Sequence, residues 1–74
     1  MFTVNIERYS KRAAHITVSY KDEEGLGLGT VRTEYVDVLF GDVEKKAVKV
    51  ANKMVERWKK QIEYKKKAIT YKVA

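Results

Sequence analysis

Residues 42–67 read DVEKKAVKVANKMVERWKKQIEYKKK and contain neither Gly nor Pro. Apolar residues recur in this stretch at steps of three and four, which places them on one face of a helix. They are Ala47, Val50, Ala51, Met54, Val55, Trp58 and Ile62. The stretch therefore predicts one long amphipathic helix over about 42–67, whose apolar face covers a sheet.

The expected ends of this helix carry suitable capping residues. Asp42 follows Gly41, and its carboxylate is a good acceptor for the free amides of a first helical turn. Glu44 places negative charge at the positive end of the helix dipole, and the lysines at 65–67 place positive charge at the negative end.

The residues before the helix alternate between apolar and polar, as half-buried strands do. Strands are expected over about 2–9, 13–20 and 30–40. The expected inward residues are Phe2, Val4 and Ile6, then Ala14, Ile16, Val18 and Tyr20, then Val36, Val38 and Phe40. Arg32 and Glu34 share the inward parity, so the third strand is expected to begin beyond the helix or to contain a bulge.

The residues after the helix alternate again, with Ile69, Tyr71 and Val73 against Thr70 and Lys72. Residues 69–73 are therefore a candidate short fourth strand. The sequence as a whole predicts a single α+β domain over 1–74. It consists of a three-stranded antiparallel sheet, or a four-stranded one, with one long helix packed on one face.

Composition narrows the classes of protein. The chain has 74 residues and no Cys, which excludes disulfides and thiolate metal sites. No apolar run approaches the roughly 20 residues of a membrane span, and the N-terminus lacks the apolar segment of a signal peptide. We therefore expect a cytoplasmic protein with no membrane partner.

The sequence gives little support for catalysis or for a cofactor. The single His15 is expected on the exposed face of its strand, without another His or Cys to share a metal ion. The acids at 22–24 lack EF-hand spacing, and the glycines at 25, 27 and 29 lack the Lys and helix of a phosphate loop. We expect no enzyme, no metal and no cofactor.

Charge is the strongest functional signal. The net charge is +6, and all of the excess lies in 42–67, where ten basic residues oppose four acids. The candidate nucleic-acid contacts are Lys45, Lys49, Lys53, Arg57 and Lys60. A row of lysines contacts successive phosphates without reading sequence, so the leading hypothesis is a small nucleic-acid-binding module, with DNA as the first candidate. The alternative for this face is a solvated lysine surface that keeps a small domain in solution.

A protein-binding adaptor or inhibitor is the competing class. Leu26 and Leu28 lie in a polar, Gly-rich connection over 21–29, where they either tuck under the sheet or form a contact for a partner. A helix of 26 residues spans about 39 Å against roughly 26 Å for strands of eight, so Ile62 and Tyr64 are expected to overhang the sheet. The tail or a second copy must then cover them. This overhang and the open sheet edges favour a homodimer.

The order of three strands and one helix is similar, in architecture alone, to the arm-binding domains of phage-type integrases and to the second half of double-stranded RNA-binding domains. The sheet of this chain lacks the Arg and Lys with which the integrase domains read a major groove. The similarity therefore implies the fold and assigns no family.

Overall fold

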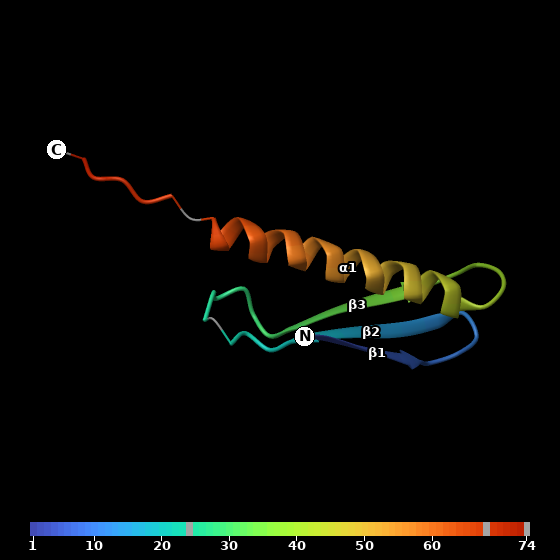
Figure 1. The fold of residues 1–74 in the computed structure, drawn as a ribbon. Helices are drawn as coiled ribbons and strands as arrows, with labels where there is room; N and C mark the ends of the chain where they lie inside the picture. The colour runs from blue at the N-terminus through green and yellow to red at the C-terminus, as the bar shows by residue number, and fades with distance from the viewer. Residues whose placement is uncertain (24, 68, 74) are drawn as a thin grey trace.

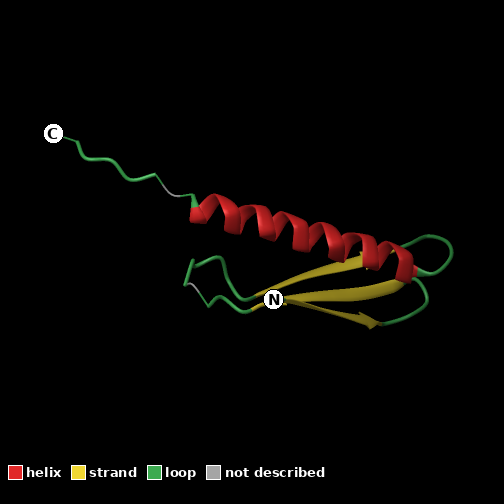
Figure 2. Ribbon diagram, viewed as in Figure 1, coloured by secondary structure: helices red, strands yellow, loops and turns green. Residues whose placement is uncertain are grey.

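The computed structural model describes residues 1–23, 25–67 and 69–73 and has an α+β fold. Three strands come first, β1 (Phe2–Arg8), β2 (Ala13–Tyr20) and β3 (Val31–Asp37), followed by the single helix α1 (Val43–Lys66). The helix lies across one face of the sheet and leaves the other face open (Figures 1 and 2). The predicted architecture of a three-stranded antiparallel sheet under one long helix is confirmed.

The sheet is antiparallel with the order β1-β2-β3, so β2 is its central strand. The register pairs Ile6 with Ile16 and Val4 with Val18 on the face that the helix covers. The residues of β2 that point to the helix, Ala14, Ile16 and Val18, are fully buried. The alternation predicted for β1 and β2 therefore places their apolar residues on the sheet side of the core.

The helix supplies the other half of the core and packs mainly on β2. Its buried residues are Val43, Ala47, Ala51, Trp58 and Ile62, and all but Val43 were predicted for the apolar face. Asp42 is the N-cap, and its Oδ1 accepts a hydrogen bond of 2.8 Å from the backbone N–H of Glu44. The helix ends at Lys66, and Lys67 caps it.

The third strand ends three residues earlier than predicted, at Asp37. Phe40 was expected to face the core, yet Phe40 and Leu39 are 86% and 82% exposed. The reason is that the chain must leave the sheet to climb to the helix layer, and Gly41 completes this turn with a φ of +78°. Backbone hydrogen bonds hold both sides of the turn, from Val38 N–H to Arg12 O and from Val43 N–H to Lys11 O, each 2.9 Å.

Arg32 corrects a second expectation, because β3 pairs with β2 without a bulge and Arg32 still lies under the helix. Its guanidinium carbon sits 4.3 Å from the centre of the Trp58 ring system. Arg32 Nη2 donates to Gln61 Oε1 at 2.7 Å and to Leu28 O at 3.2 Å. An inward arginine is tolerated here because an aromatic face and two acceptors replace the water that it loses.

Trp58 is the centre of the C-terminal half of the core. It is fully buried, and its ring contacts those of Phe2 and Tyr20 at centroid distances of 5.5 and 5.6 Å. The indole Nε1–H is buried and has no hydrogen-bond partner among the described residues. Burial of aromatic surface therefore outweighs one unsatisfied donor at this position.

Residues 69–73 do not form a fourth strand. They continue past the end of the helix and away from the sheet (Figure 1). The tail was one proposed cover for Ile62, but Ile62 is already buried, at 8% exposure, without it. The other overhanging residue, Tyr64, remains 76% exposed.

Candidate nucleic-acid interface

The outer face of α1 holds the predicted cationic residues in a row. Lys45, Lys49, Lys53 and Lys60 are all exposed and lie on the side of the helix that faces away from the sheet. The first three follow one another every four residues, which separates them by about 6 Å along the axis. Lys60 extends the row by roughly 10 Å. We call these four residues the lysine row.

Arg57 stands apart from the lysine row. It lines a shallow hollow on the β3 side of the helix, together with Met54 and with Arg32, Thr33 and Glu34 of β3. The acceptor Glu34 in this hollow makes it less favourable for a phosphate than the outer face is. The structure therefore brings together four of the five predicted contacts and places the fifth on a flank.

Among the described residues, the lysines of the row form no ion pair, although Glu56 lies on the same face between Lys53 and Lys60. The acids at the start of the helix form ion pairs with Arg8 instead. Its guanidinium lies 2.9 Å from the N-cap Asp42 and 3.8 Å from Glu44. Lysines four residues apart repel one another by some tenths of a kcal/mol per pair, and no described carboxylate pairs with them to offset this repulsion.

Asp42 carries a shifted pKa at the start of the helix. The hydrogen bond from the Glu44 backbone N–H has the largest effect and lowers the pKa of Asp42. Desolvation opposes it, and the positive charge and hydrogen bond of Arg8 lower the pKa further. The carboxylate is therefore ionised at neutral pH and bound by Arg8. The Asp42 carboxylate therefore forms no ion pair with the lysine row.

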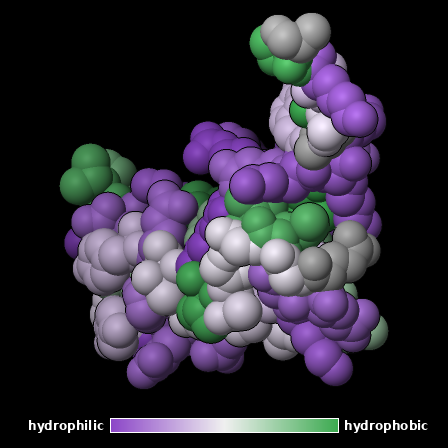
Figure 3. Space-filling model, turned by 90° about the vertical axis from the view of Figure 1, so that its left-hand side faces the viewer, coloured by the Kyte–Doolittle hydropathy of each residue, from purple (hydrophilic) through white to green (hydrophobic). Residues whose placement is uncertain are grey.

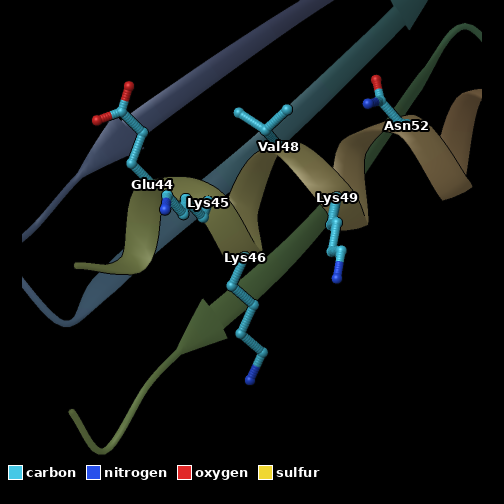
Figure 4. A pocket seen from close by; sticks show the side chains of 6 residues that line it. All are labelled: Glu44, Lys45, Lys46, Val48, Lys49 and Asn52. Atoms are coloured by element: carbon cyan, nitrogen blue, oxygen red, sulfur yellow. The ribbon is translucent and has the colours of Figure 1, made fainter. Parts of the chain in front are cut away.

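The start of the helix shows how these side chains diverge (Figure 4). Lys46 and Lys49 point to one side of the helix, and Glu44, Val48 and Asn52 point to the other. All of the residues that line this shallow depression come from one helix, so they cannot enclose a small molecule. The surface suits a broad polyanion better than a compact ligand.

Comparisons with protein-family models, with curated proteins and with solved structures found no match for this chain. No group of three or more metal-binding side chains occurs among the residues that the structure describes. Within the same residues, no helix is long and apolar enough to cross a membrane.

The four residues predicted as protein contacts lie in different settings. Leu26 and Leu28 are partly buried and pack against the core, which favours the tucked alternative over an exposed contact. The Asp22 carboxylate orders their loop, because it accepts hydrogen bonds from the backbone N–H groups of Leu26 and Gly27 at 2.9 and 3.2 Å. Ile62 belongs to the core, and only Tyr64 of the four is largely exposed.

Two basic residues have roles that the sequence did not indicate. Lys46 Nζ donates to the backbone carbonyl of Asp37 at 2.7 Å and so ties the helix to the end of β3. Arg8 ties the end of β1 to the helix N-cap. Both contacts join residues far apart in sequence or on different elements, and no local pattern could have revealed them.

Proposed function

We propose that this chain is a small, non-enzymatic module that binds nucleic acid through the lysine row. The observation that carries the proposal is the row itself, four exposed lysines on one face that have no ion pair among the described residues. Each lysine that neutralises a phosphate releases counterions, so binding is driven by charge and weakened by salt. The row has no ordered Arg, Asn or Gln aimed at base edges, so we expect little sequence preference.

The test is a triple substitution, Lys45→Gln, Lys49→Gln and Lys53→Gln, assayed by fluorescence anisotropy against labelled duplex DNA, single-stranded DNA and RNA at several salt concentrations. Gln is nearly as good a helix former as Lys, so the fold should persist. The affinity should fall by about tenfold or more at low salt. The slope of log affinity against log salt should become shallower by about 0.9 for each duplex phosphate that the variant no longer neutralises.

A matched control separates position from total charge. Lys11→Gln, Lys21→Gln and Lys65→Gln remove the same three charges from exposed positions outside the lysine row. This variant should keep most of the affinity and most of the salt dependence. Equal losses in the two triple variants would mean that only net charge matters, and an unchanged slope in the folded row variant would reject the interface.

A protein-binding adaptor is the second candidate function. The observation in its favour is the turn between β3 and α1, where Leu39 and Phe40 are almost fully exposed on a backbone held from both sides. Exposed large apolar residues on an ordered surface are typical of protein contacts. This candidate takes precedence if the parent protein binds none of the three nucleic acids at low salt.

A further inference from the structure

The segment 69–73 has the pattern of a strand and lacks a neighbour to pair with. Ile69, Tyr71 and Val73 are 88, 78 and 84% exposed. No hydrogen bond joins this segment to the rest of the described chain. In Figure 3 green apolar side chains stand at the outer end of the tail, above a surface where purple, pale and green side chains are mixed. Alternating β-branched and aromatic residues favour a half-buried strand over this extended, solvated state.

The open edge of β1 offers the complementary backbone groups. Tyr9 N–H donates a hydrogen bond to Ala13 O at 3.0 Å. By the register of the two strands, the backbone N–H and C=O groups of the odd-numbered residues of β1 therefore point toward β2. In an antiparallel pair the bonded and non-bonded positions alternate. The N–H and C=O groups of Phe2, Val4, Ile6 and Arg8 therefore point away from the sheet, where another strand can pair with them.

The apolar side chains beside this edge are incompletely covered. Val4 of β1 is 41% exposed on the face that carries the helix, because α1 lies mainly over β2. Val48 is 45% exposed and lies one helical turn after Glu44, whose carboxylate reaches Arg8 of β1. Val48 therefore borders the same side of the sheet. A strand added outside β1 would cover both valines.

The β3 edge does not fit the same segment. Besides the buried Val36, its inward residues are Arg32 and Glu34, and Arg57 lines the same hollow from the helix. Lys46 already occupies the carbonyl of Asp37 at the end of this edge. Apolar residues of an added strand would meet charge there, whereas at β1 they meet Val4 and its neighbours.

The segment cannot pair over its whole length with β1 of its own chain. Val43 N–H bonds to Lys11 O, so the helix begins beside the far end of β1. Its 24 residues span about 36 Å, whereas the seven of β1 span about 23 Å. The helix thus overshoots Phe2 by more than about 10 Å. The two steps from Lys67 to Ile69 cover at most about 7 Å, so Ile69 cannot return to the level of Phe2 and most of the segment is left without a partner strand in its own chain.

We propose that residues 69–73 of one copy add as a fourth strand to β1 of a second copy. Ile69, Tyr71 and Val73 then lie against Phe2, Val4 and Ile6 and beside Val48 of that copy. Lys72 falls on the opposite face, which carries Thr3, Asn5 and Glu7 of β1. Reciprocal exchange between two copies gives a closed, twofold dimer and satisfies both open edges of this kind.

The oligomeric state tests this proposal without nucleic acid, so its failure is separate from that of the lysine row. Light scattering on a size-exclusion column should give twice the chain mass of 8.6 kDa for the parent. Tyr71→Lys should raise the dimer dissociation constant by at least about tenfold, because it places a charge against the apolar strip. The matched control Thr70→Lys carries the same charge on the opposite face and should remain dimeric.

Two changes at the receiving edge complete the test. Val4→Lys should also yield monomer. Val4→Pro should do the same, because it removes a backbone N–H that faces the open edge and does not pair with β2. Mixing Val4→Lys, which has an intact tail, with Tyr71→Lys, which has an intact edge, should restore a heterodimer with one exchanged strand. A monomeric parent at all concentrations would overturn the proposal, as would a dimer that Tyr71→Lys leaves unchanged.

Discussion

Truncation of Trp58 is the sharpest test of the core. Trp58→Ala removes a fully buried ring with two aromatic neighbours and a guanidinium over its face. Buried Trp→Ala changes cost about 3 to 5 kcal/mol. The change also removes a buried indole N–H that has no partner among the described residues. This offsets part of the loss of stability, since an unsatisfied donor destabilises by about 1 to 3 kcal/mol. We therefore expect a loss of about 3 kcal/mol.

That loss is large for so small a domain. At about 0.05 to 0.15 kcal/mol per residue, 74 residues give a total stability of roughly 4 to 11 kcal/mol. A loss of about 3 kcal/mol should lower the melting temperature by more than about 10 °C. Because Trp58 is the only Trp, unfolding must be followed by circular dichroism rather than by fluorescence.

Trp58→Phe is the matched comparison. It keeps an aromatic ring against Phe2 and Tyr20, removes the unsatisfied N–H and leaves a smaller cavity, so it should cost clearly less than Trp58→Ala. A Trp58→Ala variant that melts within about 3 °C of the parent would refute the assignment of this ring to the core. Equal destabilisation by Ala and Phe would argue against the role of the aromatic contacts.

Two further predictions concern residues that bind across elements. Arg32→Lys keeps the charge but loses the planar contact with Trp58 and the fork that reaches Gln61 and Leu28, so it should cost about 1 to 2 kcal/mol in urea unfolding; an unchanged midpoint would mean that the contact contributes nothing. The pKa of Asp42 is lowered in the folded state, so the stability it provides is present above its ordinary pKa of about 4 and is lost as the pH falls through the folded value. Asp42→Asn should therefore flatten the loss of stability below about pH 4 in acid titrations, and a curve parallel to that of the parent would argue against this linkage.

Local pattern predicted most of the fold. The alternation in β1 and β2 and the apolar face of α1 were correct because both depend on short repeats that any chain segment displays by itself. The lysine row was predictable for the same reason. The side of the helix on which a charge lies follows from its spacing alone.

The errors all depend on contacts between distant residues. The alternation in sequence continues through Phe40. The end of β3, however, depends on where the chain must leave the sheet to reach the helix, and the sequence of the third strand does not show this. Arg32 was expected to lie beyond the helix or at a bulge, because its partners Trp58 and Gln61 lie more than twenty positions away. The bonds of Lys46 to Asp37 and of Arg8 to Asp42 were hidden for the same reason.

The turn between β3 and α1 combines exposure with a fixed backbone, and this affects how proteases treat the chain. Leu39 and Phe40 are the kind of side chain that a chymotrypsin-like specificity pocket accepts. Cleavage, however, requires several residues to extend into the protease, and the bonds of Val38 and Val43 to the β1–β2 turn oppose this. The extended segment around Tyr71 has no such restraint. In the monomer the first cut should therefore remove the tail and leave the more conspicuous Phe40 intact.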